Sequence, residues 1–365
     1  MTRIVLVCER LDAAGGVERF CCGLANHLAG LGWAVALAST SPAGARPPYD
    51  LHPQVQVLHA PLALPPAGGP LRRLALALRQ WHIGRALAGL LRRTPADVLL
   101  LNGLTGAVSV LAAAPGLARR AVCCDHNHFD ARSRPWRWAR RLLYPRVAAV
   151  VSLTEADRAR FAALNPRTEV IANASALQAP TPVAGTAPVV LAVGRHVAQK
   201  GLDLLLQAWA SVAAARPDAR LQIVGDGPET AALQALATRL GLDPSVAWLP
   251  ATTGIEALYR AAALFVLPSR YEGMPLALLE AQALGLPAVA FDCPTGPREI
   301  LGGQGGSLVP AGDVAGLAAA LIALLADPER RAQMAAAALA RSRSHFSPAQ
   351  HFARWTALLQ RVAAG

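Results

Sequence analysis

The segment VGRHVAQKGLD, residues 193–203, places two cations, Arg195 and Lys200, just after an apolar run. Lys200 is the only lysine in a chain that otherwise contains 34 arginines. A compact ammonium on a thin stem fits crowded places that a planar guanidinium does not fill. The segment therefore indicates a tight polar site that could hold a diphosphate. The alternative is that this single lysine was retained by chance. It is not a P-loop, because the residue order differs.

A second pattern lies in PSRYEGMPLALLEAQALGLPAVAFDCPTGPREI, residues 268–300. Glu272 lies in a glycine-containing turn, and Glu280 follows inside an apolar helix, where a carboxylate requires a partner. The hydroxyl groups of a ligand could supply that partner. Backbone amides at the start of this helix favour anionic or hydroxyl-rich ligands. The amides concerned belong to the region of Gly273, Met274 and Leu276.

The tetrapeptide DHNH, residues 125–128, follows a predicted strand that ends near Cys124. Its histidines and the adjacent cysteines could suggest a metal, but alternating side chains at a strand end converge poorly on one ion. We therefore interpret His126 as a single site histidine and expect no metal. Near the N-terminus, Gly15 and Gly16 precede a predicted helix, where they either let a ligand approach the backbone or simply make a tight turn.

Short apolar runs that alternate with alanine- and leucine-rich helices must position these residues. The predicted strands are residues 3–8, 33–39, 97–101 and 147–153 in the first half, and 189–194, 220–225, 263–268 and 286–291 in the second. Near-continuous apolar strands separated by helices are typical of parallel sheets covered on both faces. The fold class is therefore α/β, with two doubly wound domains that bind ligands beyond the carboxyl ends of their strands.

Length and charge both indicate two domains. A chain of 365 residues exceeds one typical core. Residues 1–180 contain 21 arginines and 10 acidic residues, a net charge of +11, whereas residues 181–365 reach only +1. We predict an N-terminal domain at 1–180, a C-terminal domain at 181–345 and a final helix at 346–365. The charge of the first domain favours an anionic partner.

Two segments hold much of the basic charge, namely residues 71–93 and residues 131–146, the second of which contains Trp136 and Trp138 among six arginines. Basic amphipathic helices with tryptophan suit an anionic membrane surface. The alternative is a solvated arginine face on a helix that packs against the core. The sequence has no nucleic-acid-binding signature, so we expect no nucleic acid partner.

The six cysteines lack metal or redox spacing and are interpreted as reduced thiols in a cytoplasmic protein. The N-terminal apolar run is too short and too soon interrupted by charge for a signal peptide. No apolar stretch is long enough to span a bilayer.

Taken together, these motifs resemble glycosyltransferase family 4, whose members are retaining enzymes of GT-B fold. The resemblance rests on GGVER, the region of His126, TEADRARF (154–161), VGRHVAQKG, IVGDGPE (223–229) and the 268–300 segment with its paired glutamates. It implies two Rossmann-like domains facing a cleft. The segment FDCPTGPREI resembles the corresponding segment of family members that build bacterial surface polysaccharides, such as lipopolysaccharide, or lipid-linked glycans.

The resemblance also implies residue roles. Arg195 and Lys200 would neutralise the donor diphosphate, and Glu280 would bind the ribose hydroxyls. The transferred sugar would be held by Glu272 with the amides of Gly273 and Met274, and His126 would contact it at the reaction centre. Leu276 would also belong to the donor-binding site. Gly16 would allow the acceptor or a phosphate to approach the backbone. No cofactor or metal is expected. The partners are a nucleotide sugar, by default a UDP-sugar, and a glycan or lipid-linked acceptor at the inner face of the cytoplasmic membrane.

Three alternatives remain at this point. A sugar-nucleotide epimerase of GT-B fold would act on the donor without an acceptor. A non-catalytic basic module that binds membrane or nucleic acid would leave Arg195, Lys200, Glu272 and Glu280 without a role. A glycogen- or sucrose-type synthase has a similar fold, but the basic first domain gives it no support.

Overall fold

A computed structural model describes residues 1–12, 15–62, 72–183, 185 and 187–365, with only the backbone of 72–77. The chain divides into two compact units. Unit 1 comprises Met1–Ala172 together with Ala349–Gly365, and unit 2 comprises Asn173–Pro348. Residue 180, the predicted domain limit, lies in unit 2 of this division. Residue 345 is the last residue of a helix in the same unit.

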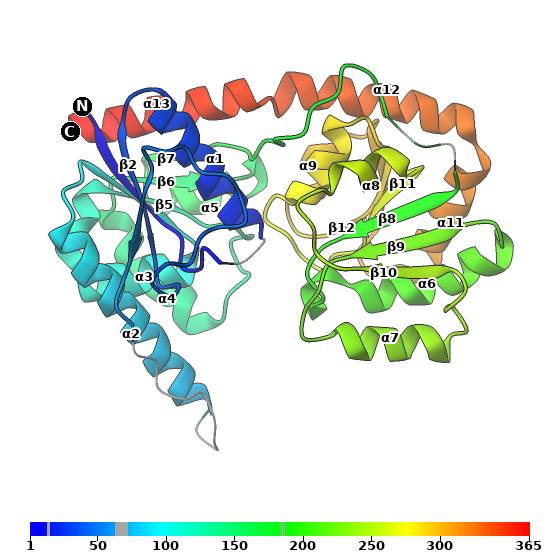
Figure 1. Ribbon diagram of the computed structural model, residues 1–365, viewed down its shortest axis with the longest axis horizontal. Helices are drawn as coiled ribbons and strands as arrows, with labels where there is room; N and C mark the ends of the chain where they lie inside the picture. The colour runs from blue at the N-terminus through cyan, green and yellow to red at the C-terminus, as the bar shows by residue number, and fades with distance from the viewer. Residues whose placement is uncertain (13–14, 63–71, 184, 186) are drawn as a thin grey trace. The chain divides into compact units, whose positions relative to one another are not determined.

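Unit 1 is built on a parallel sheet with the strand order β3-β2-β1-β4-β5-β6-β7 (Figure 1). The strands are β1 (Arg3–Val7), β2 (Ala34–Ser39), β3 (Gln56–His59), β4 (Val98–Asn102), β5 (Ala121–Cys124), β6 (Ala149–Ser152) and β7 (Thr168–Val170). The central strands β1, β4, β5 and β6 are almost wholly buried, as expected for strands covered on both faces. The four strands predicted by range in this half are confirmed as β1, β2, β4 and β6, and the strand predicted to end near Cys124 is confirmed as β5, whereas β3 and β7 were missed.

Helices cover both faces of this sheet, with α2, α3 and α4 packed in sequence along one face. The helices are α1 (Gly16–Gly30), α2 (Arg72–Arg93), α3 (Leu104–Ala113), α4 (Arg134–Leu143), α5 (Glu155–Ala162) and α13 (Pro348–Ala364), with the 3-10 turns η1 (Pro115–Arg120) and η2 (Tyr144–Arg146). One hydrophobic core, which includes Leu99, Leu101 and Tyr144, lies between the sheet and α2–α4. All six cysteines of the chain are free and buried.

The C-terminal helix α13 packs on α1 through aromatic side chains. The ring of Phe20 lies 5.4 Å from that of Trp355, and His27 stacks on Phe352 with a centroid distance of 4.5 Å. His351 Nδ1 lies 2.7 Å from the carbonyl oxygen of Ala172. These contacts fasten the last seventeen residues to unit 1.

Unit 2 is a second parallel sheet, with the order β10-β9-β8-β11-β12-β13. The strands are β8 (Val189–Val193), β9 (Arg220–Val224), β10 (Val246–Leu249), β11 (Leu264–Leu267), β12 (Ala288–Asp292) and β13 (Gly306–Pro310). The four strands predicted for this half are confirmed as β8, β9, β11 and β12, and β10 and β13 were missed. The fold class of two doubly wound parallel sheets is therefore correct.

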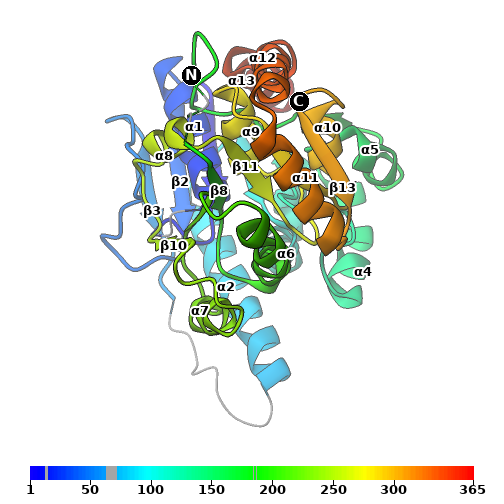
Figure 2. The same cartoon turned by 90° about the vertical axis from the view of Figure 1, so that its right-hand side faces the viewer.

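The helices of unit 2 are η3 (Ala198–Lys200), α6 (Leu202–Ala215), α7 (Thr230–Arg239), α8 (Glu256–Ala261), α9 (Leu276–Ala283), α10 (Pro297–Leu301), α11 (Val314–Ala326) and α12 (Pro328–His345). In Figure 1, α6 and α7 lie below the strands β9 and β10, and Figure 2 shows the same two helices end-on. On the same face, α11 packs against α6. The opposite face carries α9, α10 and α12. Among the described residues, no helix is long and apolar enough to cross a membrane.

Each sheet reverses its strand order at one point, where two neighbouring strands send their connections in opposite directions. In unit 1 this point lies between β1 and β4, and in unit 2 it lies between β8 and β11. Ligands of open parallel sheets bind beyond the carboxyl ends of the strands at such a point. The loops after these four strands are therefore where functional side chains are expected.

Candidate functional site

The loop after β8 in unit 2 carries Arg195 and Lys200. Gly201 ends this loop with φ +63°, a conformation in which a side chain is strained. A Cβ at Gly201 would lie 2.0 Å from the carbonyl oxygen of Pro268, so only glycine allows the loop to pack against the end of β11. This close approach sets Lys200 beside the turn that contains Glu272.

Lys200 and Glu272 form an ion pair in which Nζ lies 2.6 Å from Oε1. The two side chains are 20% and 6% exposed, so the pair is shielded but not sealed from solvent. The stem of Lys200 runs past Gly194, where a Cβ would be in ordinary van der Waals contact at 3.4 Å from its Cδ.

Ser269 Oγ donates a hydrogen bond of 2.7 Å to the same Oε1 of Glu272. One carboxylate oxygen thus receives both the ammonium and a hydroxyl. Within the described part of the chain, Oε2 has no hydrogen bond of its own. Because a carboxylate oxygen accepts up to two bonds, Oε2 is available to a ligand hydroxyl.

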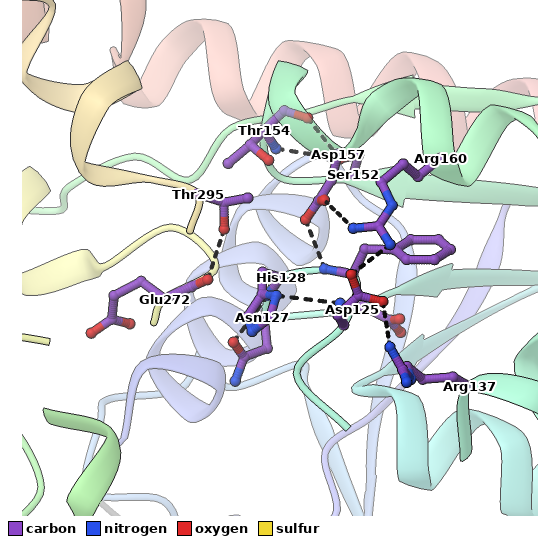
Figure 3. A network of polar contacts seen from close by, with 12 residues as sticks. Asp125, Asn127, His128, Arg137, Ser152, Thr154, Asp157, Arg160, Glu272 and Thr295 are labelled. Atoms are coloured by element: carbon purple, nitrogen blue, oxygen red, sulfur yellow. Dashed lines mark hydrogen bonds and ion pairs between the residues drawn. The ribbon is translucent and has the colours of Figure 1, made fainter. Parts of the chain in front are cut away.

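The backbone of Glu272 is held from the loop after β12. Thr295 Oγ1 donates to the Glu272 carbonyl oxygen at 2.7 Å (Figure 3). Thr295 has φ +59° and is the one non-glycine residue with positive φ among the residues that the structure describes. Such a conformation costs about 1–3 kcal/mol and persists only where the surroundings enforce it. The strained backbone at Thr295 therefore indicates that the surrounding residues hold the turn around Glu272 in this conformation.

The turn leads into α9, which begins at Leu276. The backbone N–H groups of Gly273 and Met274 donate no hydrogen bond to any described residue. Asn173 Nδ2 donates to the carbonyl oxygen of Met274 at 3.3 Å and so fixes the peptide on its other side. Open amides at the start of a helix are suited to bind an anion or a hydroxyl oxygen.

Glu280 lies on α9 and is buried. The hydroxyl of Tyr259, on α8, lies 2.9 Å from its Oε2 and 3.0 Å from the Ala277 carbonyl oxygen. The partner that the sequence required for this carboxylate is therefore available within the protein. Tyr259 was not identified from the sequence, which offers no signal linking it to Glu280.

Arg195 is exposed, and its side chain makes no hydrogen bond or ion pair with any residue that the structure describes. The structure thus brings Lys200 and Glu272 into contact and leaves Arg195 as a separate cation. The next residue, His196, is buried, with Nδ1 2.8 Å from Thr230 Oγ1 and its amide bonded to the Asp226 carbonyl oxygen. The buried His196 anchors the loop below Arg195.

Gly225 and Gly227 in the loop after β9 allow this anchoring. A Cβ at Gly225 would lie 2.1 Å from the Gly194 carbonyl oxygen, and one at Gly227 would lie 2.5 Å from the His196 carbonyl oxygen. Both glycines have positive φ. The segment IVGDGPE therefore supports the cationic loop from the side.

In unit 1, His126 follows β5 and is half-buried. Its Nε2 lies 2.9 Å from Oδ1 of Asn102, the last residue of β4. The ring of Phe20 on α1 lies 4.9 Å from the imidazole. Burial lowers the pKa of His126 to about 4, with a smaller contribution from His351, so the imidazole is neutral near pH 7. Gly16, the other predicted residue of this unit, is the first residue of α1.

Asp125 and His128, two other residues of the DHNH tetrapeptide, make contacts of their own. Asp125 is buried and binds Arg140 at 3.0 Å and the Tyr144 hydroxyl at 2.5 Å. His128 Nδ1 accepts from the amide of Asp130, whose carboxylate also binds Arg137 and Arg160 (Figure 3). Within the described ranges, no three potential metal ligands come together.

The basic segment 131–146 divides into a buried and an exposed part. Arg140, one of the six arginines of this segment, is buried against the rings of Phe129 and Phe161. Trp138 and Leu142 are 63% and 46% exposed one helical turn apart. In segment 71–93, Leu71 and the side chains of 72–77 lie outside the described residues.

Two family models match the chain. One, described as Glycosyltransferase Family 4, matches residues 14–177, and another, described as Glycosyl transferases group 1, matches residues 187–327. The chain is 29% identical to an uncharacterised glycosyltransferase of Haemophilus influenzae over 92% of its own length and 93% of the relative. It is 27% identical to the amylovoran biosynthesis glycosyltransferase AmsD of Erwinia amylovora, over 84% of this chain and 85% of that one.

Solved structures share the fold. Sucrose-phosphate synthase from Thermosynechococcus elongatus superposes with a TM-score of 0.85 at 20% identity and covers all of both chains. HepE from Anabaena, in complex with UDP and glucose, superposes with a TM-score of 0.77 at 20% identity over 99% of this chain and 100% of that one. The arrangement of two Rossmann-like units is thus the GT-B architecture of known glycosyltransferases.

Proposed function

The chain belongs to glycosyltransferase family 4, and we propose that it transfers a sugar from a nucleoside diphosphate sugar to a glycan or lipid-linked acceptor. We further propose that the reaction retains the anomeric configuration, needs no metal and serves the synthesis of a bacterial surface polysaccharide. The names of the relatives support a glycan product, since one of them acts in amylovoran biosynthesis.

The observation that carries this proposal is the Lys200–Glu272 pair at the reversal point of the unit 2 sheet. An ammonium has three N–H bonds, and among the described residues Glu272 occupies one of them. The other two bonds are available to donor phosphate oxygens, and Arg195 adds a second cation on the same loop. Charge that develops on the leaving nucleotide would be stabilised by these cations.

The transferred sugar would then be held by Glu272. Oε1 is occupied by Lys200 and Ser269, so Oε2 would accept bonds from sugar hydroxyls. The amides of Gly273, Met274 and Leu276 would contribute donors to the sugar or phosphate oxygens. Glu280 would bind the ribose hydroxyls beside Tyr259.

In unit 1, neutral His126 would accept a hydrogen bond from the sugar at the reaction centre. Gly16, without a side chain at the start of α1, would let the acceptor or a phosphate come close to the backbone. UDP is the first nucleotide to test, since the related fold of HepE has been seen with UDP and glucose.

The test is a thermal-shift screen against UDP-, GDP- and dTDP-sugars, because binding to the native state raises its apparent stability. A hit is then incubated with and without a candidate acceptor. Transfer of the sugar, with an unchanged anomeric configuration by NMR, supports the proposal. An isomerised donor in the absence of acceptor would instead identify an epimerase. Lys200→Arg should transfer more slowly than the parent, and an equal rate would contradict the requirement for lysine.

We propose peripheral association with an anionic membrane through the exposed face of α4 and its flanks. This face carries Trp138 and Leu142, and four exposed arginines that form no ion pair with a described residue: Arg132, Arg134, Arg141 and Arg146. Tryptophan and arginine together are typical of helices that lie in the headgroup region.

Sedimentation with vesicles of neutral or anionic lipid tests this face. Binding to anionic vesicles should weaken with salt, because exposed charges are screened over about 10 Å at 0.1 M. Leu142→Glu should reduce binding, whereas Leu240→Glu, at an exposed leucine of unit 2, should not. Equal binding to neutral and anionic vesicles at low salt would contradict the proposal.

A further inference from the structure

His126 has a neighbour that no sequence motif points to, the buried Asn102 at the end of β4. Its amide nitrogen donates to the Val7 carbonyl oxygen at 3.0 Å and lies 3.3 Å from Cys21 Sγ. A carbonyl oxygen only accepts hydrogen bonds. The atom of Asn102 that faces Val7 must therefore be the NH2 group.

This orientation determines the proton on His126. With its nitrogen turned to Val7, Asn102 presents the oxygen Oδ1 to His126 Nε2 at 2.9 Å. Oδ1 also only accepts, so Nε2 must carry a hydrogen. In a neutral imidazole the other ring nitrogen, Nδ1, then has a free lone pair. Within the described chain, Nδ1 makes no hydrogen bond.

The surroundings keep the ring neutral. Its neighbours are the ring of Phe20 on α1, the amide of Asn102 on β4 and, through space, His351 on α13. None of these offers a negative charge, and the adjacent carboxylate of Asp125 is already bound to Arg140 and Tyr144. Burial lowers the pKa of His126 to about 4.

We infer that Asn102 is a positioning residue that locks His126 in the Nε2–H tautomer, so that Nδ1 is a fixed acceptor for a hydroxyl of the bound sugar. The orientation of Asn102 is held by main chain, because Val7 belongs to the central strand β1, where it is paired with β2 on one side and β4 on the other. The expected effect of Asn102 on kcat rests on the proposed glycosyl transfer, whereas the expected tautomer of His126 does not.

The direct test is 15N NMR of the histidine ring nitrogens in the whole protein, with His126 assigned through His126→Gln. At pH 7 we expect a protonated Nε2 and an unprotonated Nδ1. A protonated Nδ1, or an imidazolium with both nitrogens protonated, would overturn the inference. This measurement needs no substrate, so it stands even if no donor is turned over.

Variants then test the positioning role. Asn102→Leu removes the acceptor and should mix the two tautomers, with a fall in kcat of about tenfold, the worth of one hydrogen bond. Asn102→Asp places a carboxylate against the ring, should raise the pKa of His126, and should shift the acid limb of the kcat profile to higher pH.

Asn165→Leu is the matched control. Asn165 is equally buried in unit 1, but its amide bonds the Tyr144 and Val147 carbonyl oxygens, away from His126. It should lose stability while keeping the His126 nitrogen shifts and the kcat per folded molecule. If Asn102→Leu leaves the shifts and kcat at parent values, the positioning role is wrong. If the shifts change and kcat does not, Asn102 sets the tautomer without assisting transfer, and the inference about the sugar hydroxyl fails.

Discussion

Two ion pairs in this protein have the same chemistry and opposite surroundings. Arg140 and Asp125 in unit 1 are 1% and 5% exposed, whereas Lys200 and Glu272 in unit 2 are 20% and 6% exposed. Asp125 has both oxygens in use, one on Arg140 and one on the Tyr144 hydroxyl. Among the described residues, both side chains that donate to the Glu272 carboxylate do so to Oε1.

The difference separates a pair that supports the fold from a pair that can receive a ligand. Arg140 donates through its second NH2 group to the Phe129 carbonyl oxygen and stacks on the Phe129 ring, whereas its buried Nε has no hydrogen-bond partner among the described residues. Lys200 has N–H bonds that no described residue accepts, is partly exposed, and follows the carboxyl end of β8. A short distance between opposite charges is thus no sign of function; unused hydrogen-bonding capacity that a ligand can reach is.

The largest effect on stability is expected from Arg140→Leu. Removing one partner leaves the buried Asp125 carboxylate without its counter-charge, and such a loss lowers the free energy of unfolding by about 3–5 kcal/mol. Urea unfolding followed by circular dichroism measures this. The kcat per folded molecule should not change, and a specific loss of activity would mean that unit 1 also contains a functional ion pair.

Lys200→Ala should act in the opposite way. The loss of a preorganised cation at the leaving group lowers kcat by roughly 100- to 1000-fold. Initial rates of sugar transfer measure this. The melting temperature should fall less than in Arg140→Leu, because Lys200 is 20% exposed and water can reach the vacated place beside the buried Glu272 carboxylate. Strong destabilisation with normal kcat would reverse the contrast between the two pairs.

Acid should weaken unit 1 through the buried His351. Burial lowers its folded pKa to about 4 from the ordinary value of 6.5. Between pH 6.5 and about pH 4, the His351 imidazole is protonated in the unfolded chain but neutral in the native chain. The contribution of His351 to the free energy of unfolding is therefore fully present above pH 6.5 and is lost as the pH falls toward 4. The loss from this group is roughly 3 kcal/mol.

Hydrogen exchange of the α13 amides at pH 7 and pH 4.5 measures the effect. His351→Gln keeps a donor for the Ala172 carbonyl oxygen but does not titrate, so its α13 should depend less on pH. An equal pH dependence in parent and variant would rule out His351 as the cause.

The smallest effect is expected from Ser269→Ala, which removes one of the two bonds to Glu272 Oε1. A single hydrogen bond of this kind contributes about 0.5–1.5 kcal/mol, so kcat should fall by about tenfold or less. Steady-state rates with the identified donor measure it. A fall as large as that of Lys200→Ala would mean that the hydroxyl itself contacts the substrate.

The sequence predicted the parts of this site that depend on residue type. Lys200 was found because it is a single lysine, and Glu272 because it lies in a turn ahead of an apolar helix. Their strands, β8 and β11, are continuous apolar runs. The strands β3, β7, β10 and β13 were missed because all four are edge strands of their sheets and are partly exposed, so they lack the continuous apolar run of the buried strands.

The supporting residues could not be found in the same way. Ser269, Thr295 and Asn102 are common residue types whose roles come from contacts between loops far apart in the chain. The burial of Arg140 could not be predicted either, because a basic segment does not reveal which side chain the helix turns inward. Only the packing of α4 shows that this one is buried.

The central claim is that the loop of Lys200 binds the diphosphate of the donor. Calorimetric titration of the parent and of Lys200→Met with UDP, with GDP as a second probe and uridine as the phosphate-free control, tests it most directly. We expect the diphosphate to bind at least about tenfold more weakly to the variant, the loss of one charge-assisted bond, with uridine binding unchanged. Equal affinity of parent and variant for both diphosphates would contradict the account.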